Sequence, residues 1–178
     1  MDNNLAEVKE KAAKIKVVIM DVDGVLTDGR IVYDIYGDEL KFFDVADGLG
    51  VMLAQRAGLA AAIISARASR TITRRAKDMQ VKLLFQNFPH KLKAYQRIMR
   101  RLRLTDKEIC FIGDDLVDLG PMKRAGLAVA VENAASEVKQ AAHYVTARRG
   151  GRGAVRETVE LILKSQGKWD QILAVYNA

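Results

Sequence analysis

The chain has 178 residues, of which 49% are hydrophobic and 29% charged, and this balance fits one globular domain and excludes a disordered chain. The single cysteine, Cys110, sits in an apolar run and excludes a disulfide framework within the chain. The sequence shows neither an N-terminal hydrophobic signal segment nor an apolar run of membrane-spanning length, so we expect a cytoplasmic protein with no membrane partner.

The net charge of +7 suits either a nucleic acid or a small polyanionic substrate. Much of the basic charge lies in residues 67–77 and 91–103, where its spacing indicates solvated helix faces. Aromatic residues make up only 6% of the chain, so stacking platforms for single strands are not evident. We therefore expect no nucleic-acid partner.

A short apolar run, Val17–Met20, follows a charged helix that ends near Lys14, and it is followed at once by Asp21, Asp23 and Gly24. This pattern predicts a buried parallel strand that ends at the carboxyl edge of a sheet, where open α/β sheets bind ligands. Two residues with one residue between them on an extended chain point to the same face, so both carboxylates can face one site. The glycine that follows permits the chain to turn directly after the strand. The alternative is an ordinary polar exit from strand to loop.

The next segment predicts a β-hairpin, Arg30–Ile35 paired with Glu39–Phe43, because apolar residues alternate on both sides of a Tyr-Gly-Asp turn. The hairpin comes directly after the first strand, so we expect either a flap beside the site or a contact between subunits. Its aromatic and apolar side chains need cover, which favours packing against another subunit.

Strands and helices then alternate to the end of the chain. The expected strands are 59–65, 81–85, 109–113, 127–131 and 144–146, and the expected helices are 47–57, 69–79, 89–102, 116–125, 135–142 and 154–165. This alternation predicts an α/β protein with a doubly wound, mainly parallel sheet. No linker is visible, so we expect a single domain, 1–178, with a hairpin flap at about 30–44 and a C-terminal arm and helix at about 148–178.

Three expected strands end in polar residues that suit chemistry, namely Asp21, Ser65 and Asp114, and Lys91 begins the helix after a fourth strand. Clustered carboxylates repel one another unless a cation joins them, and all-oxygen ligation favours Mg²⁺. A carboxylate can attack phosphorus only if the negative charge of both is offset. The metal and the lysine would offset it, while the serine hydroxyl donates to a phosphoryl oxygen. The pattern predicts phosphoryl transfer.

Four segments, Asp21-Val-Asp-Gly-Val-Leu-Thr27, Ser65-Ala-Arg67, Lys91 and Gly113-Asp-Asp-Leu-Val-Asp118, resemble the motifs of phosphatases of the haloacid dehalogenase superfamily. The resemblance covers almost the whole chain and implies a Rossmann-like fold, here without room for a large cap domain. The stretch GVLTDG, the hairpin and the late GGRGAVRE are most similar to phosphatases that act on 3-deoxy-D-manno-octulosonate 8-phosphate (KDO 8-phosphate) in the lipopolysaccharide sugar pathway. The resemblance implies Mg²⁺-dependent hydrolysis of this ester to KDO and phosphate through an aspartyl-phosphate.

The resemblance also implies roles for the acidic residues. Asp21 would be the nucleophile and a metal ligand. Asp23 would be the general acid/base and would give its backbone carbonyl to the metal. Asp114 would be the third protein ligand, supported by Asp115 and Asp118. Asp118 could instead cap the helix at Leu116 or face solvent.

The substrate contacts that the resemblance implies are Ser65, Ala66, Arg67, Lys91, Asp47, Gly48 and Arg152. The family forms tetramers in which hairpins pack together and a C-terminal tail reaches a neighbouring site, so the glycines of 150–153 would form a flexible arm that brings Arg152 to substrate. A glycine-rich loop before the last helix is the alternative.

Two positions depart from the family pattern. Ala66 replaces the usual glycine of the second motif, a mild change if its φ is negative. Ala46 stands where many relatives have an arginine, which removes a candidate contact to a sugar acid and leaves the substrate open. A sugar-acid phosphate of the nonulosonate 9-phosphate type is therefore one alternative, and a nucleic-acid 3′-phosphatase is another.

A non-catalytic phosphoacceptor domain also pairs aspartates with a hydroxyl and a lysine in a doubly wound sheet. Asp23 argues against it, because an acid/base two residues after the nucleophile promotes hydrolysis, whereas a phosphoacceptor must keep its phosphoryl group.

Overall fold

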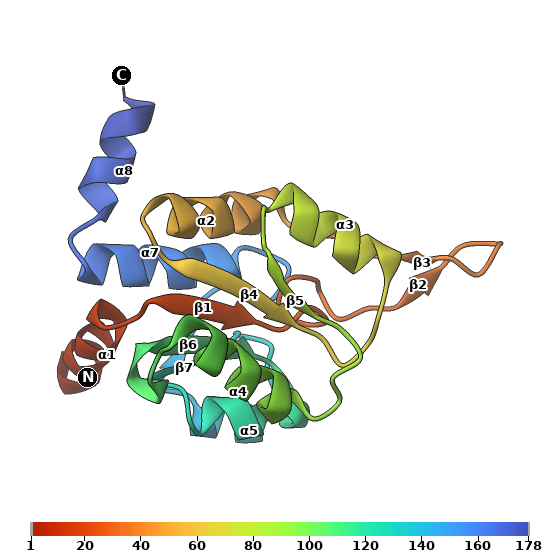
Figure 1. Ribbon diagram of the computed structural model, residues 1–178, viewed down its shortest axis with the longest axis horizontal. Coiled ribbons are helices and arrows are strands. Elements are labelled where there is room, and N and C mark those ends of the chain that lie inside the picture. The colour runs from red at the N-terminus through yellow and green to blue at the C-terminus, as the bar shows by residue number, and fades with distance from the viewer. Residues whose placement is uncertain (1, 178) are drawn as a thin grey trace.

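The computed structural model describes residues 2–177, in which six parallel strands form one sheet in the order β5-β4-β1-β6-β7-β8 (Figure 1). The strands are β1 (Val17–Met20), β4 (Ala60–Ile64), β5 (Leu83–Phe85), β6 (Ile109–Gly113), β7 (Leu127–Ala130) and β8 (Tyr144–Val145). All neighbouring pairs are parallel, so the predicted parallel sheet is confirmed.

Helices cover both faces of this sheet. They are α1 (Asp2–Ala13), α2 (Val45–Arg56), α3 (Arg70–Asp78), α4 (Lys91–Leu102), α5 (Leu119–Met122), α6 (Ser136–Ala141), α7 (Ala154–Ser165) and α8 (Trp169–Tyr176), with short 3₁₀ turns η1 (Asp106–Glu108) and η2 (Leu116–Asp118). Figure 1 shows α2, α3 and α7 on one side of the sheet and α4 and α5 on the other. The chain runs from β1 outward to β5, crosses over through α4, and continues from β6 to β8, which is the doubly wound arrangement.

The core lies on both faces of the central strands. Every residue of β1, β6 and β7 is buried, which explains why these strands are continuous apolar runs rather than alternating ones. Cys110 is buried within β6, where it packs as a small apolar side chain. The rigid centre of the sheet fixes the strand ends from which the site is built.

Two helices differ from the sequence prediction. The expected helix 116–125 is divided into η2 and α5, because the backbone of Asp118 turns tightly, with its N–H donating to the carbonyl of Asp115 at 2.8 Å, and Pro121 has no N–H to continue an α-helical ladder. The C-terminal helix α8 was not predicted, because the last expected helix ended at 165. Gly167, with φ +65°, separates the two.

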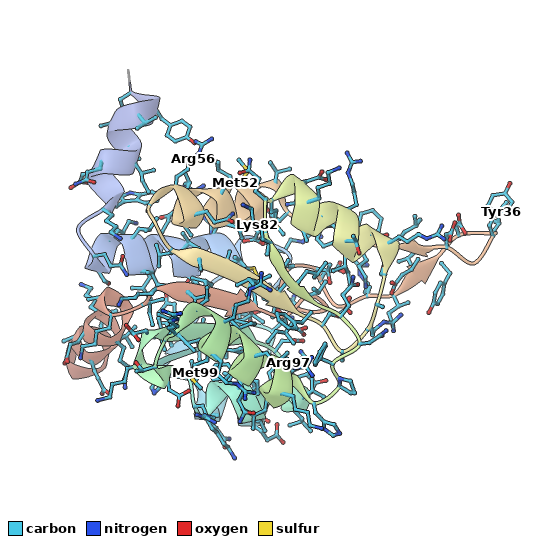
Figure 2. The ribbon with its side chains drawn as sticks, in the orientation of Figure 1. Tyr36, Met52, Arg56, Lys82, Arg97 and Met99 are labelled. Carbon is cyan, nitrogen blue, oxygen red and sulfur yellow. The ribbon has the colours of Figure 1, made fainter. Side chains whose placement is uncertain are left out.

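The hairpin consists of β2 (Val32–Tyr33) and β3 (Glu39–Leu40). It is shorter than predicted, because no third strand of the described chain pairs with it. It extends away from the sheet, with Tyr36 at its outer end (Figure 2). No helix within residues 2–177 combines the length and apolar character needed to cross a bilayer.

Candidate active site

The candidate site lies at the carboxyl ends of three neighbouring strands, β4, β1 and β6. Asp21 follows β1, Ser65 follows β4 and Asp114 follows β6. Because the strands are parallel, their ends meet at one edge of the sheet. Lys91, the first residue of α4, reaches the same place, with its Nζ 2.8 Å from Asp21 Oδ1. The structure thus assembles at one edge the four residues that the sequence spaces far apart.

The chain turns directly after β1, as the Asp-x-Asp-Gly pattern predicts. Gly24 has φ +95°, a conformation that favours glycine, and three successive amides after it donate to the carbonyl of Val22. A Cβ added at Gly24 would lie 1.9 Å from Asp114 Oδ2. The glycine therefore makes the turn and also leaves room for the carboxylate of the neighbouring strand.

Lys91 is held between two carboxylates. Its Nζ lies 2.8 Å from Asp21 Oδ1 and 2.6 Å from Asp118 Oδ1, and the side chains of the lysine and of Asp118 are 1% and 0% exposed. The second oxygen of Asp118 accepts the backbone N–H groups of Asp114 and Asp115, at 3.0 and 3.3 Å. Asp118 therefore fixes the lysine and the loop after β6, and it does not face solvent.

Burial and mutual repulsion perturb the carboxylates. Burial, followed by the charge of Asp118, raises the pKa of Asp21 to about 7. Burial and the charges of Asp21 and Asp118 raise the pKa of Asp114 to about 8. Burial alone would lower the pKa of Lys91, but the two carboxylates beside it outweigh burial and raise that pKa. The site thus holds an excess of negative charge that one lysine does not offset.

These acids fit a divalent cation. One oxygen each of Asp21, Asp114 and Asp118 lies within 4.8 Å of the others. Oδ1 of Asp114 is buried without a hydrogen-bond partner among the residues that the structure describes, whereas both oxygens of Asp118 already accept hydrogen bonds. Hard oxygen ligands of this kind suit Mg²⁺. Asp115 is exposed and accepts the N–H of Leu116 at 2.7 Å, so it caps η2 and lies outside the cluster.

Asp23 forms an ion pair that sequence reasoning missed. Its carboxylate accepts a hydrogen bond from Nζ of Lys41, which follows β3 of the hairpin. Lys41 Nζ also lies 3.1 Å from Glu39 Oε1, and that oxygen accepts from Arg67 Nη2 at 2.8 Å. The sequence does contain a signal for this pair. Side chains alternate between the two faces of the hairpin, so the glutamate and the lysine lie together on the face opposite Leu40.

The second motif has the backbone geometry that its alanine requires. Ser65 is 1% exposed, and its Oγ accepts the N–H of Arg67 at 3.1 Å, which leaves its hydroxyl proton free to donate. Ala66 is not among the residues with positive φ, so replacement of the usual glycine is mild here. Arg67 is 41% exposed and ion-paired to Glu39.

The contacts of Asp47 and Gly48 run to α7 and α3 rather than to the acidic cluster, and their role as substrate contacts stays a prediction. Asp47 is buried and accepts the N–H groups of Gly153 and Arg156, at 3.2 and 2.8 Å, so it caps α7. A Cβ at Gly48 would lie 2.4 Å from Nη2 of Arg75, so this glycine makes room for a guanidinium. Both residues join α2 to neighbouring helices.

The segment 150–153 is a packed turn rather than a freely swinging arm. The N–H of Gly151 donates to the carbonyl of Val25 at 2.8 Å, and a Cβ at Gly150 would lie 1.7 Å from the carbonyl oxygen of Gly24. The glycines are needed here for close approach to the loop after β1. Arg152 is exposed between them and lines a groove of about 670 Å³ together with Arg30 and residues at the base of the hairpin.

Comparison with known proteins identifies the family. The model of the haloacid dehalogenase-like hydrolase family matches residues 61–156, more than half of the chain. The chain is 40% identical over 166 residues to the 3-deoxy-D-manno-octulosonate 8-phosphate phosphatase of Escherichia coli, covering 93% of this chain and 88% of the relative.

Solved structures are similar over almost their whole length. A haloacid dehalogenase superfamily hydrolase from Legionella pneumophila superposes with a TM-score of 0.96 at 42% identity, covering 98% of this chain and 96% of that chain. The KDO 8-phosphate phosphatase of Moraxella catarrhalis, in complex with magnesium ion, phosphate ion and KDO, gives 0.94 at 39% identity, covering 96% and 98%.

The chain belongs to the haloacid dehalogenase-like hydrolases. Within this family it is similar to enzymes named KDO 8-phosphate phosphatase, at 40% identity in the Escherichia coli relative. The resemblance drawn from the four motifs is confirmed.

Proposed function

We propose that the protein is a Mg²⁺-dependent phosphatase that hydrolyses KDO 8-phosphate to KDO and inorganic phosphate. The observation that carries this proposal is the buried arrangement of Asp21, Lys91 and Asp118 beside an oxygen of Asp114 that has no hydrogen-bond partner within residues 2–177. The names of the relatives, and the Moraxella structure with magnesium, phosphate and KDO, support the choice of metal and substrate.

In the proposed reaction, a carboxylate oxygen of Asp21 attacks phosphorus, the bond from phosphorus to the sugar oxygen breaks, and Asp23 gives its proton to that oxygen. Water then attacks the aspartyl-phosphate, Asp23 takes a proton from the water, and the bond between phosphorus and Asp21 breaks. Lys91 and the Ser65 hydroxyl hold phosphoryl oxygens. Mg²⁺, held by Asp21, Asp114 and the carbonyl of Asp23, would supply positive charge beside the phosphoryl group.

Phosphate release from a panel of esters tests the substrate. We expect the highest kcat/KM with KDO 8-phosphate, complete loss of activity in EDTA, and recovery with added Mg²⁺. A higher kcat/KM with a nonulosonate 9-phosphate would show that this ester, the alternative that Ala46 leaves open, is the substrate instead. Preferred hydrolysis of a 3′-phosphorylated oligonucleotide would contradict a sugar-acid substrate, and full activity in a metal-free preparation would contradict the metal.

The nucleophile is tested by Asp21→Asn. The amide is nearly isosteric with the carboxylate but is a poor nucleophile, so we expect turnover to disappear while the circular dichroism spectrum is retained. Asp170→Asn, the same change on the exposed surface of α8, should keep wild-type turnover. Phosphate release by the Asp21 variant at the wild-type rate would remove this residue from its proposed role.

Arg152 is proposed to contact the substrate carboxylate from its groove beside the hairpin. Arg152→Ala should weaken kcat/KM for the sugar-acid phosphate by ~1–3 kcal/mol, the range for a hydrogen bond to a charged group. Hydrolysis of p-nitrophenyl phosphate should barely change, since it has no carboxylate. Arg74→Ala on the exposed face of α3 is the control. Equal losses on both substrates would show that Arg152 supports the fold or the chemistry instead.

A homotetramer assembled through the hairpins is also proposed. The exposed apolar residues of and beside the hairpin are Ile31, Tyr33, Ile35, Tyr36, Leu40, Phe42 and Val45. Such a patch on a protruding hairpin is typical of an interface, and second copies of the chain would cover it. Light scattering should give the mass of a tetramer for the wild type and a smaller mass for Ile35→Asp. A monomeric wild type would overturn this part of the proposal.

A further inference from the structure

Lys41 is a buried cation on a hairpin whose tip is exposed. Its side chain is 1% exposed, whereas Ile35 and Tyr36 at the tip are 90% and 86% exposed. Lysine is almost never fully buried unless it is paired. The pairing here is with Asp23 and Glu39, and the steps proposed for phosphate hydrolysis do not use Lys41 itself.

The hairpin base that carries this lysine is anchored to the loop after β4 and to α3. Glu39 Oε1 accepts from Arg67 Nη2 at 2.8 Å, and its backbone carbonyl accepts from Thr71 Oγ1 at 3.1 Å. The first contact joins β3 to the loop after β4, and the second joins it to α3. The position of the Lys41 ammonium is therefore set by the sheet as well as by the hairpin.

Asp23, in contrast, needs a partner from outside its own loop to hold the orientation of its side chain. It lies in the turn after β1, and its side chain is 23% exposed, so water can reach the carboxylate. A proton-transfer group must lie within hydrogen-bond reach of the reacting oxygen. An ionic hydrogen bond to a fixed ammonium is strong enough to hold one rotamer of such a side chain.

We propose that Lys41 is a positioning residue, which holds the Asp23 carboxylate where it can exchange a proton with the leaving oxygen and with water. This inference rests on the proposed phosphatase function and adds a residue to it. Glu39 holds the ammonium from its other side, so the flap contributes to the chemistry as well as to the surface beside the site.

The dependence of rate on the leaving group tests the proposal. An alkyl phosphate needs a proton on its leaving oxygen, whereas p-nitrophenolate leaves without one. In Lys41→Met we expect kcat/KM for the sugar-acid phosphate to fall ~10–100-fold and that for p-nitrophenyl phosphate to fall less than about threefold, because general acid catalysis contributes ~10²–10⁴-fold. Lys41→Arg keeps the positive charge and should recover part of the loss.

Lys77→Met is the matched control, because it makes the same change on the exposed face of α3 and should leave both substrates unaffected. Equal losses on the two substrates in Lys41→Met, or no recovery with arginine, would overturn the positioning role. If the wild type hydrolyses no phosphate ester, the proposed function fails separately. A crystal structure of Lys41→Met then decides, since the Asp23 carboxylate should leave its place, and an unmoved carboxylate would refute the inference.

Discussion

Gly151 brings the late turn so close to the loop after β1 that no side chain fits between them. Its φ is +64°, and an added Cβ would lie 2.4 Å from the carbonyl carbon of Thr27. Gly167 has nearly the same φ, +65°, but a Cβ there would meet no atom of the described part of the chain within 4 Å. A substitution at Gly167 therefore measures the cost of backbone conformation alone, whereas one at Gly151 adds the cost of a steric clash.

We expect Gly167→Ala to lower the free energy of unfolding by ~1–2 kcal/mol, because an L-residue in the left-handed region costs about that much. Gly151→Ala should lose a further ~1–3 kcal/mol from overpacking, and it should also lose phosphatase activity because the loop beneath it carries Asp21 and Asp23. Urea unfolding and phosphate release measure the two effects. Equal stability and full activity in both variants would show that the turn can move away freely.

At the scale of single residues, the sequence predicted the positions of those site residues that lie next to a strand or at the start of a helix. Asp21 and Asp114 come directly after apolar strands, and Lys91 begins a helix, so their positions at the sheet edge follow from chain direction. The ion pair of Lys41 was not predicted, because it depends on contacts of the hairpin with Asp23 after β1 and with Arg67 after β4. The cap that Asp47 forms on a helix more than a hundred residues later was not predicted either, because no local signal indicates such a partner.

At the scale of the element, β8 is tied to β7 through an imidazole. Nδ1 of His143, the residue before β8, accepts the backbone N–H of Ala128 at 2.9 Å. Burial, and then the nearby charge of Lys11, lowers the pKa of His143. A protonated imidazole has no acceptor at Nδ1, so this edge of the sheet depends on the neutral form.

The folded-state pKa of His143 lies below its unfolded value of about 6.5, so its contribution to stability is present above that pH and is lost as the pH falls through the lower folded value. Asn at 143 offers an acceptor oxygen that does not titrate. We expect the free energy of unfolding of the wild type, relative to His143→Asn, to decrease as the pH falls from about 7 to about 5. His90→Asn, at the exposed start of α4, should track the wild type. Parallel pH curves for wild type and His143→Asn would contradict this account.

The helices whose bounds the sequence predicted best have both a helical repeat of apolar residues and a residue that marks the helix end. The predicted helix 154–165 agrees with α7 because apolar residues repeat at helical spacing and Gly153 precedes it. The division of 116–125 could not be predicted, because the tight η2 turn is set by the contact of the Asp118 carboxylate with Lys91 and with the loop after β6. Tertiary contacts override helical periodicity there.

At the scale of the whole molecule, the proposed metal should couple the site to global stability. A ligand that binds only the folded state stabilises it by RT ln(1 + [L]/Kd), about 2.7 kcal/mol at a hundredfold excess over Kd. Mg²⁺ should therefore raise the melting temperature near neutral pH. Asp114→Asn should abolish this shift, and without metal it should melt no lower than the wild type, because it removes one of the repelling carboxylates.

Scanning fluorimetry with and without Mg²⁺ measures both effects, and Asp170→Asn should respond to the metal as the wild type does. A Mg²⁺-dependent shift that persists in Asp114→Asn would place the cation elsewhere. Because this readout needs no turnover, it tests the metal independently of the substrate.

The turn at 150–153 also bears on the order in which the protein becomes functional during synthesis. β1 and its acidic loop leave the ribosome first, yet the hydrogen bond from Gly151 to Val25 joins that loop to a segment made near the end of translation. A nascent chain that lacks this segment holds its nucleophile on an unsupported loop. Phosphatase activity should therefore begin only when α7 has emerged, so incomplete chains released early would not act on cellular phosphate esters.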